Sequence, residues 1–195
     1  MGSPRALVVM AGLVVGAVAI PAEERLCGSE RWAVKTATDG TQLHEGAPPE
    51  VRTVAQLSAL EAPRYREARP REGEELNVVA VVGYLRAVKL EEDGDLHALI
   101  SDAPDGLTMV VEIPDPGCAA RSPYKDRMAA ARAATAKLVG AVFGRKFRTL
   151  TTPPRVRVVG AIFFDKLHGQ TGMAGNGVEL HPVLDLTPAP EGSGG

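Results

Sequence analysis

Histidines and carboxylates occur in this sequence at spacings that suit metal binding or acid–base chemistry. Asp95 and His97 are two residues apart, as are Glu179 and His181. In a β-strand such residues share one face, and the leucine between them points to the other face. A carboxylate beside an imidazole is a typical ligand pair for a divalent ion and a typical general acid–base pair. We therefore take His97, His168 and His181 as candidate catalytic residues, on an outward-facing polar surface.

His168 lies in a glycine-rich segment, residues 165–177, which has glycines at 169, 172, 175 and 177. Glycines permit tight turns and let backbone amides point at a ligand. In the alternative interpretation, His168 and His181 only hydrogen-bond this segment and hold its shape. The candidate ligand-binding residues are polar side chains of this segment, of the turn at 91–94 and of the adjoining strands: Asp93, Asp95, His97, Asp165, His168, Gln170, Asn176, Glu179 and His181.

Five apolar or alternating segments are expected to form the strands that position these residues. The predicted strands cover residues 76–90, 95–101, 107–113, 156–164 and 178–186. Gly83 interrupts the first strand and indicates a bulge or a sharp bend. Ser122 as N-cap and Pro123 at the first helical position predict a helix that ends near Gly144, with one apolar stripe facing the core.

The order of three strands, a helix and two strands resembles the OB-fold, a five-stranded Greek-key barrel. An open antiparallel sheet with one covering helix has the same elements and remains an alternative. In an OB-fold, the loop between the first two strands and the loop between the last two lie at the same rim. The resemblance therefore predicts a mainly β domain over residues 76–186, with a binding surface formed by the segments 91–94 and 165–177.

Residues 23–75 are predicted to be an N-terminal strand and short-helix extension followed by a linker. Alternation over residues 31–36 predicts a strand, and Thr53 followed by Gln56 forms a capping box that predicts a short helix over 53–60. Between positions 63 and 75, charges of both signs mix with prolines, which is typical of a solvated linker. Residues 187–195 are rich in Pro, Gly and Ser and are predicted to be a disordered tail.

Residues 1–22 have the pattern of a secretory signal peptide, with Arg5 before an uncharged apolar run. That run of about 15 residues is shorter than the roughly 20 that a membrane-spanning helix needs. We therefore expect cleavage, a secreted or periplasmic protein, and no membrane association afterwards. In an oxidising compartment the pair Cys27 and Cys118 favours a disulfide, with two free structural thiols as the alternative.

The run Asp93-Gly94-Asp95, followed by Ile-Pro-Asp-Pro at 113–116, is similar to the staphylococcal-nuclease type of OB domain. In that secreted family two carboxylates on these segments help to bind calcium. The resemblance implies Asp95 and Asp115 as metal ligands, and we add Glu179 as a third candidate. The family also has an arginine on the third strand that clamps the phosphate, whereas residues 107–111 contain no basic side chain.

A second resemblance covers residues 163–183 together with residues 27–36. Its motifs are Phe-Phe-Asp, His-Gly-Gln-Thr-Gly, Asn-Gly and Glu-Leu-His-Pro, in that order. These motifs resemble a group of uncharacterised secreted bacterial proteins. The resemblance implies the same compartment and fold, and it carries no known activity.

The amino-acid composition limits the kinds of function that this protein could have. The 195 residues are 45% hydrophobic and 24% charged, with a formal net charge of −2, which excludes a wholly disordered chain and a multispanning membrane protein. Single-stranded nucleic acid is disfavoured, because no aromatic residue lies between Tyr84 and Tyr124 and there is no basic excess. The sequence favours a monomeric, non-catalytic binding module for a small ligand or a protein, with a calcium or zinc ion as the candidate cofactor. A metal-dependent phosphodiesterase and a purely structural domain are the alternatives.

Overall fold

The computed structural model describes residues 27–140 and 142–190. The predicted signal peptide at 1–22 lies outside the described residues, as does the end of the predicted tail at 191–195. In the described ranges, no helix combines the length and apolar character needed to cross a membrane.

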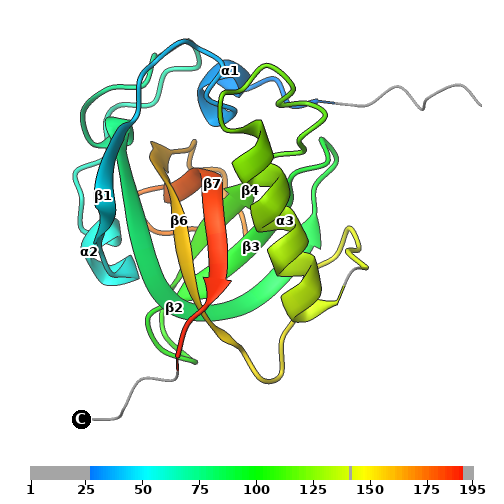
Figure 1. Ribbon diagram of the computed structural model, residues 1–195. Helices are drawn as coiled ribbons and strands as arrows, with labels where there is room; N and C mark the ends of the chain where they lie inside the picture. Colours follow the sequence, from blue (N-terminus) through cyan, green and yellow to red (C-terminus); the bar gives the residue numbers. More distant parts are fainter. Residues whose placement is uncertain (1–26, 141, 191–195) are drawn as a thin grey trace, which may run out of the picture.

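Five strands form a closed barrel (Figure 1). They are β2 (Asn77–Leu90), β3 (Leu96–Ser101), β4 (Thr108–Ile113), β6 (Arg155–Phe164) and β7 (Val178–Pro188). Their spatial order is β2-β3-β4-β7-β6, and β6 pairs back with β2 to close the sheet. β4 and β7 run parallel, whereas the other neighbours run antiparallel. The predicted OB-fold-like barrel is therefore confirmed, and the open sheet is wrong.

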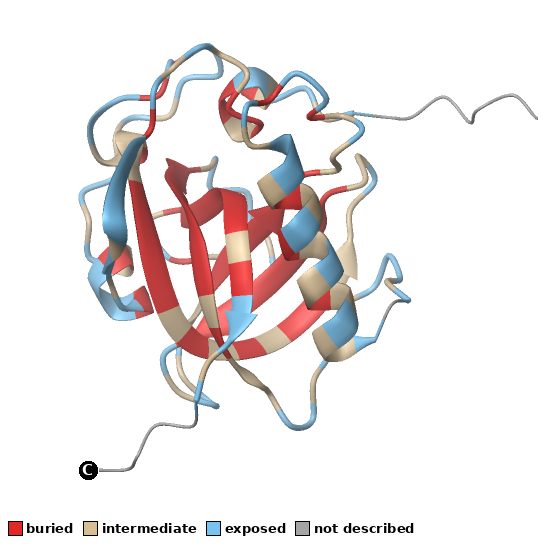
Figure 2. Ribbon diagram, in the orientation of Figure 1, coloured by how far each residue is buried: buried red, intermediate tan, exposed pale blue. Residues whose placement is uncertain are grey.

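Aliphatic side chains fill the barrel, and burial extends over nearly all of the strands (Figure 2). Leu96, Ala98 and Ile100 point inward, as the alternation of β3 predicts. The opposite face of β3 is buried as well, so that every residue of this strand is shielded from solvent. A second layer of chain therefore covers the outside of the barrel at β3.

β2 is long because it serves two neighbours in succession. Residues 78–84 pair with β6, and residues 84–90 pair with β3. Gly83 lies at this change of partner, where an added Cβ would approach the backbone oxygen of Ser101 to 2.4 Å. The bulge that the sequence predicts at Gly83 lies further along, between Leu85 and Ala87. Gly83 is thus required for close approach of two strands.

α3 (Lys125–Val139) connects β4 to β6 and begins later than the sequence predicts. Tyr124 is its N-cap, and the hydroxyl of Ser122 accepts a hydrogen bond from the Tyr124 N–H within the preceding turn. Met128, Ala131 and Thr135 are buried against the barrel. These three residues belong to the predicted apolar stripe, so the helix face is confirmed. The predicted ends are wrong, since the helix starts at Lys125 and ends at Val139 rather than near Gly144.

The segment predicted as a strand over 31–36 is instead a short helix, α1 (Trp32–Lys35). The Lys35 N–H donates to the Arg31 oxygen, and the Thr36 N–H donates to the Trp32 oxygen. Val34 is the buried residue of this helix, and Arg31 and Thr36 on either side of it are buried as well. A pattern of only four residues is compatible with one turn of helix and with a short strand, so the local sequence could not distinguish the two.

The short helix predicted over 53–60 is confirmed as α2 (Val54–Ser58), with Thr53 and Gln56 forming both bonds of the capping box. The sequence did not predict β1 (His44–Val51), which pairs in parallel with β2 at the edge of the sheet. An edge strand tolerates the two prolines of this segment, because their missing donors are not needed by a second neighbour. The remaining elements are η1 (Gly73–Leu76) and β5 (Arg148–Thr149).

The segment predicted as a solvated linker over 63–75 contains buried charges, which corrects that interpretation. Arg69, Arg71 and Glu75 are all buried. Nη2 of Arg69 lies 2.7 Å from Oε1 of Glu75 in an ion pair. Arg71 donates hydrogen bonds to the backbone oxygens of Ile162 and His181. These three charged residues thus pair with each other and with the barrel backbone, whereas others of the segment, such as Glu67, are exposed.

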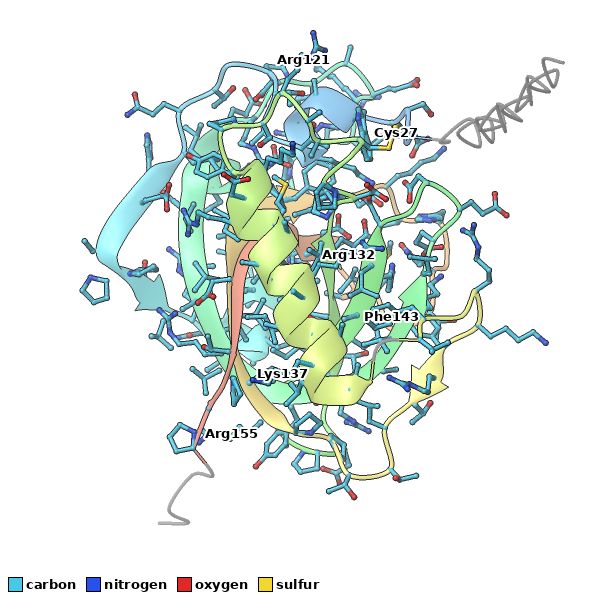
Figure 3. All side chains as sticks on the ribbon, turned by 45° about the vertical axis from the view of Figure 1, so that its right-hand side comes forward. Cys27, Arg121, Arg132, Lys137, Phe143 and Arg155 are labelled. Atoms are coloured by element: carbon cyan, nitrogen blue, oxygen red, sulfur yellow. A yellow bond between two sulfur atoms is a disulfide. The ribbon has the colours of Figure 1, made fainter. Side chains whose placement is uncertain are left out.

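A disulfide joins Cys27 to Cys118, 91 residues away, with the Cα atoms 5.6 Å apart. Figure 3 shows the sulfur–sulfur bond beside the label of Cys27, close to α1. This confirms the predicted pairing. The disulfide ties the chain just before α1 to the segment between β4 and α3, and so holds the N-terminal segment against the barrel.

Candidate functional site

The candidate site begins with a cross-strand pair on the outer face of the barrel. His97 on β3 lies directly opposite Glu112 on β4 in the antiparallel register. Nδ1 of His97 is 2.6 Å from Oε1 of Glu112 and 3.2 Å from Oε1 of Glu91. Both side chains point away from the barrel interior, as the sequence predicted for His97. Both are nevertheless buried, so this outer face is not exposed to solvent.

β7 adds His181 and Glu179 beside this pair. Nδ1 of His181 lies 3.1 Å from Oε2 of Glu112 and 3.1 Å from Oε1 of Glu179. Glu112 therefore contacts one histidine through each of its carboxylate oxygens. The parallel pairing of β4 with β7 brings these side chains together, whereas they are far apart in the sequence.

Asp95 lies just before β3 and closes the cluster on the other side of His181. Its Oδ1 accepts the backbone N–H of Asp115, while its Oδ2 is 3.5 Å from Nε2 of His181. Two sets of three residues place potential ligand atoms within 4.8 Å of one another: Glu91, His97 and Glu112, and Asp95, Glu112 and His181. These are the described residues whose geometry suits a metal ion.

Lys35 of α1 supplies positive charge to this acidic cluster. Its Nζ is 3.6 Å from Oδ2 of Asp165. Burial opposes the charged ammonium, but the nearby carboxylates, with Glu179 and Glu112 foremost, outweigh it and raise the pKa of Lys35. Lys35 is therefore held protonated, as a counter-ion rather than as a base.

The histidines are likewise held toward their charged form. Burial alone would lower the pKa of His97, but its hydrogen bonds with Glu112 and Glu91 raise it to about 9. Burial would lower the pKa of His181 as well, and the surrounding carboxylates raise it. For Glu179, burial and the charge of Glu112 raise the pKa. Perturbed groups of this kind gather at functional sites as well as in structural ion networks.

A cavity of about 420 Å³ opens next to the cluster, between the N-terminal segment and the turn that joins β2 to β3. Trp32 of α1 and Lys35 form part of its wall. Its carboxylates are Glu30, Glu91, Glu92, Asp93, Glu112 and Asp165. The cavity is therefore strongly acidic, with Glu112 as the member shared with the buried cluster.

The predicted binding residues divide into two groups. Asp93, Asp165, His168 and Gln170 line the cavity, and Gln170 also lies 3.0 Å from Nδ1 of His97. The buried cluster contains the others, apart from one: Asp95, His97, Glu179 and His181. Asn176 is the exception, because its amide donates to the backbone oxygens of residues 57 and 60 and ties the glycine-rich segment to α2.

Asp115, predicted as a metal ligand with Asp95 and Glu179, lies beside the turn before β3. Its Oδ1 accepts the Gly117 N–H, and an added Cβ on Gly94 would approach its Oδ2 to 3.0 Å. It does not belong to either group of converging ligand atoms among the described residues. The predicted set of Asp95, Asp115 and Glu179 is thus not the set that the fold brings closest together.

Three residues of the site were not predicted from the sequence: Glu112, Lys35 and Trp32. Glu112 interrupts the apolar run of β4, and a charged residue in a buried strand is a usable signal. Lys35 and Trp32 had no such signal, because their place over the barrel depends on the disulfide and on contacts of η1 with β6.

No protein-family model matches the chain, and no curated protein sequence matches it. Among solved structures, it is similar to a "putative aspartyl-tRNA synthetase" from Leishmania major Friedlin, at 11% sequence identity and a TM-score of 0.40. The match covers 85% of this chain and 27% of the other, so the chain spans about a quarter of that protein. Such low values carry no functional argument. None of these comparisons supports the resemblance to the staphylococcal-nuclease family.

Proposed function

We propose that this protein is a secreted or periplasmic, non-catalytic binding module that takes a small organic cation in the acidic cavity. The charge balance of the cavity wall carries the proposal, since six carboxylates and one lysine, Lys35, are among its described lining residues. Two of the six also have a cationic partner behind the wall, Glu91 in Lys89 and Glu112 in His97, and the balance stays negative. Like charges focused in a concave site attract counter-ions and ligands of opposite sign. The disulfide supports an oxidising compartment, where such bonds persist.

Trp32 favours an organic cation over an anion in this cavity. The face of an indole ring attracts ammonium and guanidinium groups, and the attraction grows when water is excluded. A volume of about 420 Å³ lies within the range of small-molecule sites. An acidic wall with an indole side chain is thus suited to an amine, a guanidinium compound or a quaternary ammonium ion.

The same features disfavour the phosphodiesterase alternative. A phosphodiester substrate is anionic, and its transition state needs cationic stabilisation. β4 contains no basic side chain, and Lys35 is already surrounded by carboxylates. Of the three candidate histidines, His97 and His181 do not line the cavity, whereas the exposed His168 does, with its Nδ1 2.7 Å from the backbone oxygen of Lys166. These observations support binding rather than hydrolysis.

The test is a calorimetric titration of the disulfide-intact protein, with a chelator present, against a panel of charged small molecules. The panel holds a diamine, a guanidinium compound, a quaternary ammonium ion, inorganic phosphate and a nucleoside monophosphate. We expect a cation to bind and the anions not to bind. Binding of the anions in preference to every cation would overturn the proposal.

A pair of charge-matched variants locates the ligand. Glu92→Gln removes one exposed carboxylate from the cavity wall, and Glu67→Gln removes one exposed carboxylate elsewhere. We expect Glu92→Gln to weaken cation binding several-fold and Glu67→Gln to leave it unchanged at the same ionic strength, because screening limits the reach of surface charge to about 8 Å. Equal weakening by both variants would contradict binding in this cavity.

A further inference from the structure

Two buried polar atoms face each other across a gap in the cluster behind the cavity. Oδ2 of Asp95 and Nε2 of His181 are 3.5 Å apart, and the residues are 1% and 0% exposed. They form an ion pair when His181 is protonated, but their separation is too long for a hydrogen bond, and neither atom has a hydrogen-bond partner within the described residues. Buried polar atoms without partners are rare, and each costs free energy, so such a pair calls for an explanation.

The gap has the size expected for two ligands of one metal ion. A carboxylate oxygen and an imidazole nitrogen that share a hydrogen bond lie about 2.7 to 2.9 Å apart. When both bind a tetrahedral ion at about 2.0 to 2.2 Å, they lie roughly 3.3 to 3.5 Å apart. The observed separation of 3.5 Å fits the second arrangement.

From these observations we infer that Asp95 and His181, together with Glu112, form a binding site for a divalent transition-metal ion such as zinc. Oδ2 of Asp95 and Nε2 of His181 are the principal ligand atoms. Glu112 has a ligand atom within 4.8 Å of one on each of the other two residues, although its Oε2 lies beside Nδ1 of His181 rather than beside Nε2. One position of a four-coordinate ion is left for a water molecule or a ligand.

The surroundings of His181 support this assignment. A ligating histidine usually donates its other ring N–H to a carboxylate, which fixes the ring and strengthens it as a ligand. Nδ1 of His181 lies 3.1 Å from Oε1 of Glu179, and the edge of its ring meets Phe163. Its Nε2 is thereby left pointing at Asp95. Glu179 is thus a positioning residue.

Charge and ligand type decide the class of ion. Binding of the ion displaces any proton from Nε2 of His181, and Asp95, Glu112 and Glu179 then place three carboxylates around the ring. A divalent cation offsets part of this charge. An imidazole ligand favours zinc and its first-row neighbours over calcium, which prefers a shell of oxygens.

The metal site is separate from the cation site proposed above and does not depend on it. Neither Asp95 nor His181 lines the cavity, and Glu112 alone of the three reaches its wall. A cavity that binds no organic cation therefore leaves the metal site untouched. Conversely, failure of the metal site leaves the acidic wall of the cavity as it is.

The experiment uses the full chain with its disulfide intact, stripped of metal by a chelator and then titrated with zinc alone. Metal content after gel filtration and a competition titration with a chromogenic chelator give stoichiometry and affinity. We expect about one zinc ion per chain, bound through nitrogen and oxygen only in the X-ray absorption spectrum. A folded protein that retains no zinc would overturn the proposal.

Asp95→Asn is the decisive variant, because it removes the ligand charge while preserving the fold. The asparagine oxygen can still accept from the Asp115 N–H, and its amide can donate to Nε2 of His181. We expect its zinc affinity to fall by more than the roughly 10- to 100-fold loss that is typical of a residue which only orients a ligand. Glu179→Gln should show that smaller loss.

Asp93→Asn is the matched control, since Asp93 is a cavity carboxylate two residues from Asp95 and outside the metal set. We expect it to bind zinc within a few-fold of the parent protein. Equal zinc affinity of Asp95→Asn and the parent would overturn the site, as would an equal loss in Asp93→Asn, which would place the ion in the cavity. Cooperative unfolding of each variant checks that it is folded.

Discussion

Arg31 and Glu75, 44 residues apart in the sequence, form a bidentate ion pair beneath the surface, with Nη1–Oε1 and Nη2–Oε2 distances of 2.9 and 2.8 Å. Their side chains are 1% and 0% exposed. Oε1 of Glu75 also accepts the Phe164 N–H at the end of β6. The Arg31 guanidinium lies 4.4 Å from the centre of the Phe163 ring. This pair fastens the segment that carries Trp32 and Lys35 to the barrel.

Glu75→Gln should therefore destabilise the protein strongly. Removing one partner of a buried ion pair leaves the other charged and uncompensated, which typically costs about 3 to 5 kcal/mol. Chemical denaturation measures the change in the free energy of unfolding. A double variant, Arg31→Met with Glu75→Gln, should recover part of the loss, because only Arg69, which keeps Glu72 at 3.2 Å, then lacks the Glu75 carboxylate. A loss below about 1 kcal/mol in the single variant, which is the scale of a surface pair, would contradict the argument.

Loss of the disulfide should lower stability and loosen the cavity wall. A closed loop with a sequence separation of 91 corresponds to about 4 to 5 kcal/mol in the chain-entropy model. We expect the Cys27→Ser, Cys118→Ser double variant to unfold at lower denaturant, by up to that amount. Hydrogen exchange should rise first at residues 28–35, which the disulfide holds over the barrel. Unchanged exchange in this segment would show that the buried arginines alone suffice to hold it.

The metal-free protein should lose stability as the pH rises through the upper neutral range. The pKa of His97 is about 9 in the folded protein, against 6.5 as its ordinary value. The folded state therefore binds this proton more tightly than the unfolded state does. Its stabilising effect is complete below about pH 6.5 and is lost as the pH rises through 9. His181 contributes in the same direction, since its pKa is also raised.

Urea unfolding at fixed ionic strength, with a chelator present, measures this dependence from pH 6 to 9.5. The free energy of unfolding of His97→Gln should decline less steeply with pH than that of the parent. The variant has no imidazole at position 97 that could lose a proton beside Glu112 and Glu91. Identical slopes for the parent and the variant would show that His97 is not the group responsible.

Gly83→Ala should disturb the point at which β2 changes partner. The new Cβ would lie 2.4 Å from the Ser101 oxygen, so the strands must separate. Overpacking of this kind typically costs about 1 to 3 kcal/mol. Gly175→Ala is the control, since nothing lies within 4 Å of the added Cβ there. Thermal unfolding compares the two, and equal midpoints would refute the role assigned to Gly83.

The barrel was predictable because the signals for it are local. Alternation in β3, the valine-rich sequence of β2 and the turns between strands depend on neighbouring residues, and their order matched an OB-fold-like barrel. The capping box at Thr53 and Gln56 is equally local, and it was confirmed. Where the signal was short, as over residues 31–36, local pattern could not distinguish a turn of helix from a strand.

The sequence by itself determined that Asp95 with His97, and Glu179 with His181, would share faces of their strands, because side chains alternate in any strand. It also supplied the two cysteines. Tertiary structure alone decided that these faces are buried, that Glu112 stands between the two histidines and that Lys35 balances charge of the carboxylates around them. Those relationships depend on strand register and on chain closure over tens of residues. Contacts of that kind leave no periodic signal in the sequence, since the side chains form their hydrogen bonds and ion pairs only after the barrel has closed.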